Sequence, residues 1–138
     1  MNDIIRTERE RVFMRFAKDL ASLSKCEEKK VAAIIVDEAL TQVYSIGVNG
    51  GAAGQDDCLC KTPGKYGCVH AEINALIKCR SDAPNKIMFV TLSPCVACAA
   101  AIVNAPGGFS KVYYLEGWKN EDGIKLLTKS GIKTEKLG

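Results

Sequence analysis

The chain is organised around two motifs, His70-Ala71-Glu72 and, after 21 intervening residues, Pro94-Cys95-Val96-Ala97-Cys98. They supply one imidazole and two thiols, from His70, Cys95 and Cys98. These are three ligands of the kind that tetrahedral zinc binds in proteins. Three protein ligands leave the fourth position of the metal to water, which distinguishes a catalytic zinc from a structural one. The two motifs therefore predict a catalytic zinc centre.

Glu72 lies two residues after His70, which places a carboxylate beside the expected metal. Zinc lowers the pKa of a bound water to about 7, so Glu72 is better suited to act as a base for that water than as a fourth ligand. In the alternative reading, Cys95 and Cys98 form a redox pair and His70 is a buried core histidine. We favour the zinc centre because both motifs occur in order and His70 is the only histidine in the chain.

Length and charge restrict the classes of protein to consider. The 138 residues are expected to form a single domain over residues 1–138. Nineteen Lys and Arg residues against 16 Asp and Glu residues give a net charge of +3. This mild excess slightly favours an anionic small-molecule ligand. It does not give the dense basic stripe of nucleic-acid binders, so nucleic acid is not expected as a partner.

Seven cysteines are many for a chain of this length. Residues 1–11 are mixed and charged, so they do not resemble the apolar region of a signal peptide. No stretch approaches the ~18 apolar residues of a membrane span. We therefore expect a cytoplasmic protein without membrane association. In that reducing compartment, thiols are expected to be buried, metal-bound or catalytic rather than paired in disulfides.

Apolar periodicity and breaker residues predict the order of the helices and strands. Helices are expected over about 7–24, 71–79, 94–104 and 121–129, and strands over 31–36, 41–48, 86–92, 111–115 and 132–135. Thr7 and Glu10 fit a capping box at the start of the first helix. Its apolar stripe is expected in the core: Val12, Phe13, Phe16, Ala17, Leu20 and Leu23.

This order predicts an α/β fold, a three-layer α/β/α sandwich with a central mixed five-stranded sheet. Each zinc motif falls at the start of a helix, so two helix N-termini can face each other across one metal. The positive end of a helix dipole also favours thiolate over thiol at Cys95 and Cys98.

Residues 49–69 show no periodicity, and so long a loop usually has a function or a tether. Gly50, Gly51 and Gly54 have no side chains to block the approach of a triphosphate to backbone amides. They form a candidate effector loop, for which the alternative is a flexible loop without a ligand.

The chain resembles the cytidine deaminase superfamily and, within it, the deoxycytidylate (dCMP) deaminases. H-x-E followed by P-C-x-x-C is the signature of zinc-dependent nucleobase deaminases. The resemblance rests on residues 70–76 (HAEINAL) and 90–98 (VTLSPCVAC), and on Gly47-Val48-Asn49-Gly50, which looks like the G-Y-N-G loop of the family. It implies hydrolysis of dCMP to dUMP and ammonia, feeding thymidylate synthesis, by a homo-oligomer that is often a hexamer. Many members are activated by dCTP and inhibited by dTTP, which implies Mg²⁺ with a nucleotide triphosphate effector.

Residue by residue, the resemblance assigns zinc binding to His70, Cys95 and Cys98, and proton transfer to Glu72. It implies that Asn49 binds the sugar 3′-hydroxyl, for which the alternative is a turn residue with positive φ. Further substrate contacts are implied for the backbone of Ala71 and of residues 91–93, which include Thr91 and Ser93, and for the aromatic side chains Tyr113, Tyr114 and Trp118. For each tyrosine, packing within a strand is the alternative.

The sequence departs from the family pattern before the first strand. The family has C-P-R-x-x-V-G-A where this chain has Cys26-Glu27-Glu28-Lys29-Lys30-Val31-Ala32-Ala33. Glu28 thus stands at the position of an arginine that could hold phosphate. Lys29 or Lys30 could substitute, although lysine lacks the bidentate fork of arginine.

Four cysteines outside the catalytic motif form a candidate second, structural zinc site: Cys26, Cys58, Cys60 and Cys68. The equivalents of Cys26 and Cys58 bind such a zinc in some dCMP deaminases. A closed tetrathiolate site would fix the long loop; the alternative is buried free thiols.

Three other functions stay open: a deaminase that also acts on dCTP, a tRNA or nucleic-acid base deaminase, and a silent zinc-binding interaction module. Glu72 argues against the last, because a structural site does not need it.

Overall fold

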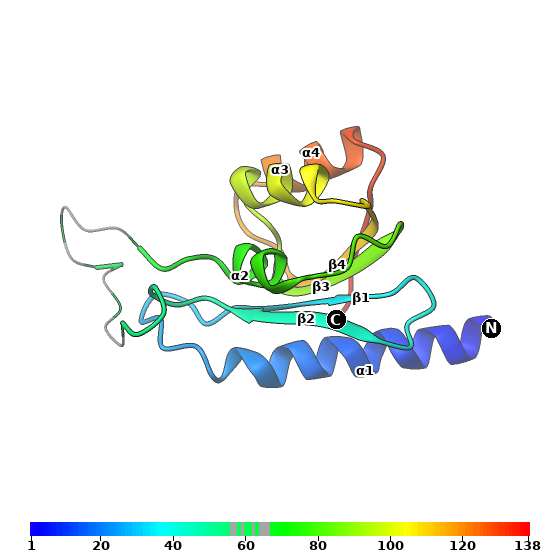
Figure 1. Ribbon diagram of the computed structural model, residues 1–138, viewed down its shortest axis with the longest axis horizontal. Coiled ribbons are helices and arrows are strands. Elements are labelled where there is room, and N and C mark those ends of the chain that lie inside the picture. The colour runs from blue at the N-terminus through cyan, green and yellow to red at the C-terminus, as the bar shows by residue number, and fades with distance from the viewer. Residues whose placement is uncertain (56–57, 59, 62, 64–66) are drawn as a thin grey trace.

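The computed structural model describes residues 1–55, 58, 60–61, 63 and 67–138, which fold around one five-stranded sheet (Figure 1). Its strand order is β2-β1-β3-β4-β5. Strand β1 pairs antiparallel with β2 and β3, whereas β4 pairs parallel with β3 and β5, so the sheet is mixed. The strands are β1 (Ala32–Val36), β2 (Val43–Val48), β3 (Lys86–Leu92), β4 (Phe109–Glu116) and β5 (Lys133–Lys136).

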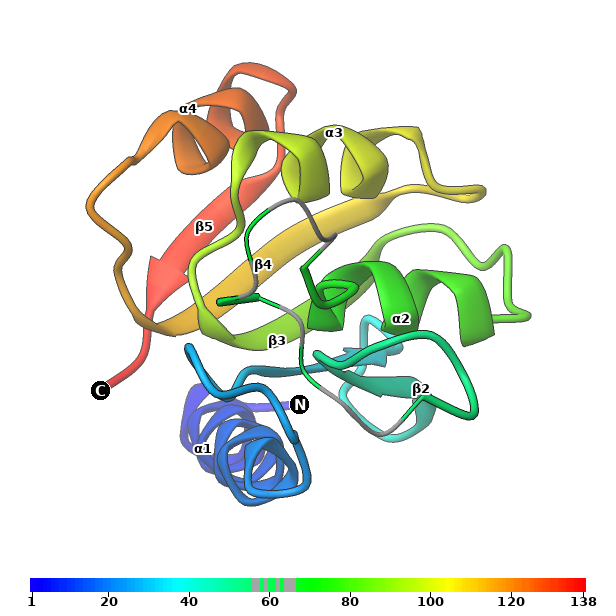
Figure 2. The same cartoon turned by 90° about the vertical axis from the view of Figure 1, so that its left-hand side faces the viewer.

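The helices cover both faces of this sheet (Figures 1 and 2). One face packs against α1, and the opposite face packs against α2, α3 and α4. The helices are α1 (Asp3–Ala21), α2 (Ala71–Lys78), α3 (Val96–Asn104) and α4 (Asp122–Lys129). This architecture confirms the predicted three-layer sandwich with a central mixed sheet.

Two apolar cores lie on either side of the sheet because successive side chains of a strand point to opposite faces. In β1, Ile34 belongs to the core under α1, and Ile35 belongs to the core under α2, α3 and α4. In β3, Phe89 and Val90 divide in the same way. Central strands buried on both faces have continuous apolar sequences, which is why these strands could be predicted from sequence.

The first helix begins earlier than predicted. The Asn2 side chain caps α1 by accepting a hydrogen bond from the amide of Ile5 (2.9 Å). Thr7 lies inside the helix, where its hydroxyl donates to the Asp3 carbonyl (2.8 Å). The predicted capping box of Thr7 and Glu10 is therefore wrong.

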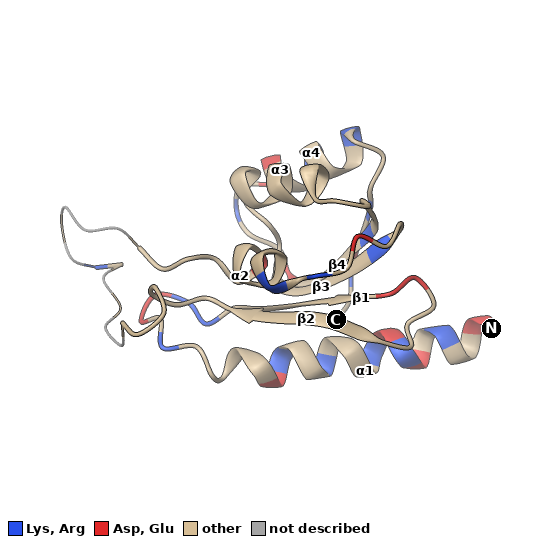
Figure 3. Cartoon of the chain, in the orientation of Figure 1, with Lys and Arg blue, Asp and Glu red and all other residues tan. Residues whose placement is uncertain are grey.

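The inward face of α1 also differs from the prediction. Met14, Ala17 and Leu20 are buried against the sheet. Val12 and Phe16 are instead 50% and 40% exposed, because the predicted apolar stripe is wider than the surface the helix contacts. In Figure 3 the ribbon of α1 carries both blue (Lys, Arg) and red (Asp, Glu) segments. Within the described part of the chain, no helix is both long and apolar enough to cross a membrane.

The zinc motifs meet at one edge of the sheet. The carboxyl ends of β3 and β4 lie side by side there, because Leu92 pairs with Glu116. The amino end of antiparallel β1 reaches the same edge. Helices α2 and α3 begin at this edge, α2 directly after His70 and α3 directly after Cys95. In open α/β sheets, ligands bind outside the carboxyl ends of parallel strands, so a ligand site is expected at this edge.

Candidate active site

The structure brings together the three predicted zinc ligands. His70 is the N-cap residue of α2, and Cys95 is the N-cap residue of α3, whose first turn carries Cys98. His70 Nδ1 lies 3.2 Å from Cys98 Sγ and 3.6 Å from Cys95 Sγ. The three ligand atoms all lie within 4.8 Å of one another.

This donor set fits Zn²⁺. Tetrahedral zinc with nitrogen and sulfur ligands holds those two atoms about 3.5 Å apart, which is close to both nitrogen–sulfur distances. Burial raises the pKa of the Cys98 thiol above its ordinary value, and the charges of Glu72 and Cys95 raise it further. A thiolate at Cys98 therefore requires a compensating cation, which a metal ion bound by these three side chains would supply.

Glu72 lies in the first turn of α2 and is only 4% exposed. Burial raises the pKa of its carboxyl, although its own backbone amide and the nearby His70 oppose that shift. A carboxyl with its pKa moved toward neutrality can both accept and release a proton near pH 7. The arrangement is suited to proton transfer beside a metal.

His70, Cys95 and Glu72 line one cavity of about 420 Å³. This volume falls within the range of about 300–1,000 Å³ that small-molecule sites occupy. Of the predicted substrate contacts, four line this cavity: Asn49, Ala71, Ser93 and Trp118. The Ser93 hydroxyl also accepts a hydrogen bond from the amide of Trp118 (2.8 Å), which joins the ends of β3 and β4 at the cavity.

Asn49 is held in a fixed orientation. Its Oδ1 accepts hydrogen bonds from the Ser24 hydroxyl (2.6 Å) and the Val31 amide (2.9 Å). Its Nδ2 donates to the carbonyl of Lys29 (2.6 Å). A side-chain amide has two hydrogens, so one is left for a ligand. Among the described residues other than glycine, positive φ angles occur at Leu40 and Asn85, so the alternative reading of Asn49 as a positive-φ turn residue does not hold.

The side chains of Tyr113, Tyr114 and Thr91 lie outside the cavity lining. This corrects the expectation for the two tyrosines, whereas the contact expected of Thr91 was through its backbone and stays a prediction. Tyr113 is buried under α1 on the opposite face, where its ring stacks on Phe89 and its hydroxyl bonds to Glu10. Tyr114 packs against the core under α2, α3 and α4 without lining the cavity. The Thr91 hydroxyl accepts a hydrogen bond from the Ala32 amide (3.1 Å) and does not line the cavity either.

Two glycines allow close packing of the segments that carry His70 and Cys95. This role was not predicted from the sequence for either glycine. A Cβ atom at Gly47 would lie 2.3 Å from the carbonyl oxygen of Ala71, at the start of α2. A Cβ atom at Gly123 would lie 1.9 Å from the carbonyl oxygen of Pro94, beside Cys95. Both glycines thus allow close backbone contact next to a predicted zinc ligand. A glycine inside a predicted helix, as at Gly123, was the available signal.

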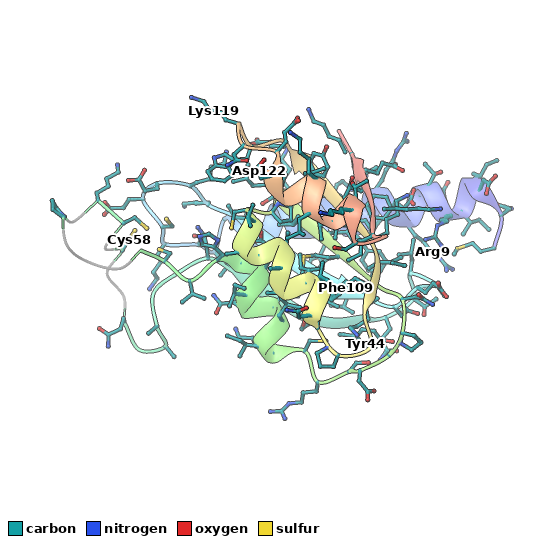
Figure 4. All side chains as sticks on the ribbon, turned by 90° about the horizontal axis from the view of Figure 1, so that it is seen from above. Arg9, Tyr44, Cys58, Phe109, Lys119 and Asp122 are labelled. Carbon is teal, nitrogen blue, oxygen red and sulfur yellow. The ribbon has the colours of Figure 1, made fainter. Side chains whose placement is uncertain are left out.

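The four remaining predicted ligands form a second sulfur cluster. Cys26 Sγ lies 3.7 Å from Cys60 Sγ and 3.8 Å from Cys58 Sγ. Cys68 Sγ lies 3.6 Å from Cys58 Sγ and 3.5 Å from Cys60 Sγ. Figure 4 shows sulfur atoms gathered beside Cys58 at one end of the molecule. Three members, Cys26, Cys60 and Cys68, also line the catalytic cavity, so residues of both clusters contribute to its lining.

The Gly50, Gly51 and Gly54 segment borders a separate cavity of about 240 Å³, together with Lys25 and Cys58. Gly54 has a φ of +85°, which glycine adopts readily. A volume below about 300 Å³ is small for a complete nucleotide. The cavity could enclose only part of such a ligand, for example its phosphates.

Comparison with known proteins gives a consistent family. Residues 7–116 match the family model described as the cytidine and deoxycytidylate deaminase zinc-binding region. The chain is 34% identical over 119 residues to the deoxycytidylate deaminase of Mycobacterium phage D29, covering 74% of this chain and 90% of that enzyme. The deoxycytidylate deaminase of Saccharomyces cerevisiae is 29% identical over 146 residues. That match covers 96% of this chain and 46% of the yeast enzyme, so the chain spans about half its length.

A solved structure agrees with this result. The dCMP deaminase of cyanophage S-TIM5, crystallised in complex with dCMP and dUMP, superposes with a TM-score of 0.83. It is 31% identical in sequence, and the match covers 99% of both chains. The chain therefore belongs to the cytidine and deoxycytidylate deaminase zinc-binding family.

Proposed function

We propose that residues 1–138 form a single zinc-dependent deaminase domain that hydrolyses dCMP to dUMP and ammonia. The observation that carries the proposal is the convergence of His70, Cys95 and Cys98 with the buried carboxylate of Glu72 at one cavity. The dCMP and dUMP bound to the cyanophage relative support a nucleotide monophosphate as substrate.

In this mechanism His70, Cys95 and Cys98 would hold Zn²⁺, which lowers the pKa of a coordinated water to about 7 and so supplies the nucleophile. Glu72 accepts a proton from the attacking water and delivers it to cytosine N3, which makes C4 more electrophilic. The hydroxide left from that water adds to C4. Glu72 then takes the proton of the new C4 hydroxyl and gives it to the 4-amino group, the C4–N bond breaks, and ammonia leaves. A carbonyl at C4 and an N–H at N3 remain in the uracil product.

The other residues around the cavity orient the substrate. The free amide hydrogen of Asn49 would donate to the sugar 3′-hydroxyl. The backbone of Ala71 and of Ser93 would contact the polar edge of the pyrimidine. Trp118, which is half-exposed at the cavity, would cover the substrate from the solvent side.

The structure favours this substrate over two alternatives. Among the described residues that line the cavity, Lys29 stands beside the acidic residues Glu28 and Glu72, so this lining does not support a basic groove for a tRNA or nucleic-acid base deaminase. A silent zinc-binding module would have no use for Glu72, whose buried carboxylate is costly to keep in the folded state.

A release assay tests the proposed function. Ammonia and uracil-nucleotide release would be measured with cytidine, dCMP, dCTP and an RNA hairpin. We expect the highest kcat/KM with dCMP. Preferred turnover of the hairpin would identify a nucleic-acid base deaminase, and comparable turnover of dCTP would broaden the substrate class. No turnover of any substrate by zinc-loaded protein would contradict an enzymatic function.

We also propose that Cys26, Cys58, Cys60 and Cys68 bind a second, structural Zn²⁺. Tetrahedral zinc with four sulfur ligands holds neighbouring sulfurs about 3.8 Å apart, and the four distances given above lie between 3.5 and 3.8 Å. The amide of Glu27 donates to Cys58 Sγ (3.4 Å) and lowers the pKa of that thiol to about 7. Backbone amides thus favour a thiolate at Cys58, whereas burial and the neighbouring thiols raise the pKa of Cys68, so a thiolate there needs a cation beside it.

Regulation by dCTP and dTTP with Mg²⁺ is a further part of the proposal, and the cavity beside Gly50, Gly51 and Gly54 supports it. Addition of MgdCTP is expected to lower the dCMP concentration at half-saturation and to raise Tm. Gly50→Asp should abolish this response, because the added carboxylate would repel phosphate, while a Cβ atom at this position meets no heavy atom within 4 Å. An unchanged saturation curve and Tm with both nucleotides would rule out the effector site. The homohexamer stays a prediction from resemblance, and the cytoplasmic location stays a prediction from the sequence.

A further inference from the structure

An exposed ion pair joins a residue of the catalytic cavity to the end of β4. Lys29 Nζ lies 2.8 Å from Glu116 Oε2, and the two side chains are 52% and 58% exposed. Lys29 belongs to the segment before β1 and lines the cavity. Glu116 is the last residue of β4, and its carbonyl accepts a hydrogen bond from the amide of Ser93 (2.8 Å). The pair therefore connects Lys29, which lines the cavity, to Glu116, whose backbone is bonded to the cavity-lining Ser93.

Lys29 is the one lysine or arginine among the described residues that line this cavity. Glu28 and Glu72 contribute negative charge to the same lining. A nucleotide phosphate, which carries a charge of about −1.5 to −2 at neutral pH, would be repelled by both carboxylates. Lys29 is thus the side chain best able to offset the charge of a monophosphate.

The backbone of Lys29 is fixed while its ammonium group is not enclosed. The carbonyl of Lys29 accepts a hydrogen bond from Asn49 Nδ2 (2.6 Å). The amide of Val31 donates to Asn49 Oδ1 (2.9 Å), which holds the same segment at a second point. Lys29 therefore starts from a fixed position next to Asn49, the proposed ligand of the sugar, and its flexible stem can move its charge.

We propose that Lys29 is the phosphate-binding residue that selects nucleoside 5′-monophosphates, and that Glu116 competes with the substrate for it. In the free enzyme the ammonium group pairs with Glu116. When the substrate binds, the ammonium group exchanges this carboxylate for the phosphate. This inference rests on the proposed function, since it concerns how the same cavity recognises dCMP.

The exchange is physically reasonable. Exposed ion pairs contribute little to stability, so separating Lys29 from Glu116 costs little. A phosphate offers more negative charge than a carboxylate and three acceptor oxygens. The hydrogen bond from Lys29 lowers the pKa of Glu116, so this carboxylate is ionised at neutral pH and competes effectively.

Substrate pairs that differ only in the phosphate test the proposal. Lys29→Met keeps most of the aliphatic stem and removes the charge, and Lys30→Met is the matched control because Lys30 does not line the cavity. We expect Lys29→Met to raise KM for dCMP about tenfold, as expected for loss of a charge-assisted hydrogen bond, with little change in kcat. Its effect on KM for deoxycytidine should be several-fold smaller, and Lys30→Met should resemble wild type with both compounds.

Removing the competitor should have the opposite sign. Glu116→Gln is expected to lower KM for dCMP about threefold. The substrate then no longer has to displace the carboxylate of Glu116 from Lys29, and an exposed ion pair is weak enough for an effect of about this size. Glu135→Gln is its control, since Glu135 pairs with Lys111 (2.9 Å) outside the cavity lining and the change in net charge is the same. The control should leave KM unchanged.

The possible failures can be told apart. Wild-type protein that deaminates neither dCMP nor deoxycytidine would overturn the proposed function, and the role of Lys29 with it. Wild-type activity on dCMP that Lys29→Met leaves unaffected would overturn the role of Lys29 alone. Equal losses with both compounds would do the same, because they would indicate a general structural defect. A raised KM in Glu116→Gln would contradict the competition.

Discussion

Glu72→Gln is expected to lower kcat for dCMP by about 10²- to 10⁴-fold, the range that a positioned acid–base group contributes. Glutamine keeps the volume of the side chain and its ability to form hydrogen bonds, but it cannot carry a proton from water to the substrate. Because burial raises the pKa of Glu72, the charged form is held against a desolvation cost. The neutral amide should therefore fold at least as stably as the wild type.

Metal content and a matched variant make this result specific. Zinc bound by His70, Cys95 and Cys98 should be retained in Glu72→Gln, because Glu72 is not one of the ligands. Glu10→Gln removes a partly buried carboxylate on α1, where it bonds to Tyr113 on the far side of the sheet, and should retain activity. A Glu72→Gln enzyme within tenfold of the wild-type kcat would remove Glu72 from the proposed mechanism.

Elements with strong local signals could be predicted from the sequence. The apolar run before Ser93 gave the bounds of β3 (Lys86–Leu92) without error. The start of α1 could not be predicted in the same way. Thr7 and Glu10 have the spacing of a capping box, but the same pattern is permitted inside a helix, and Asn2 caps the helix five residues earlier. Local capping signals compete, and tertiary packing of α1 on the sheet decides which of them is used.

The candidate site divides in the same way. His70, Cys95 and Cys98 could be placed together because each motif falls at a helix start, and the edge of the sheet brings the two starts together. Tyr113 and Tyr114 could not be assigned, because adjacent strand residues face opposite layers and the sequence does not say which layer holds the site. Tyr113 pairs with Phe89, and both side chains belong to the core under α1, on the face opposite the cavity.

The positioning glycines were missed for a different reason. Gly47 contacts Ala71, and Gly123 contacts Pro94, in each case more than twenty residues away along the chain. Periodicity and turn chemistry report on neighbours in sequence. A close backbone approach between distant segments becomes visible only when the tertiary structure is known.

Cys58→Ser/Cys60→Ser is expected to reduce bound zinc from two ions per chain to one and to lower Tm by about 10 °C. Structural zinc sites contribute directly to folding free energy, and a loss of a few kcal/mol shifts Tm by about this amount in a domain of this size. Cys79→Ser is the matched control, because Cys79 belongs to neither sulfur cluster. The control should bind two zinc ions and melt close to wild type.

The position of the tetrathiolate cluster also predicts how activity responds. Cys26, Cys60 and Cys68 line the catalytic cavity, but they are not part of the cluster formed by His70, Cys95 and Cys98. Losing the structural ion should therefore raise KM more than it lowers kcat. Cys95→Ser should show the reverse pattern, with activity lost and most of the thermal stability kept.

Metal analysis of protein purified without chelators decides between these expectations and a set of free thiols. Wild type with one zinc per chain, together with a Cys58→Ser/Cys60→Ser variant of unchanged Tm, would rule out the second site. Two ions in wild type and one in the variant would mean that a metal orders the long loop. That metal would then hold one wall of the catalytic cavity in place, since Cys68 precedes His70 by only two residues and connects the two clusters through the backbone.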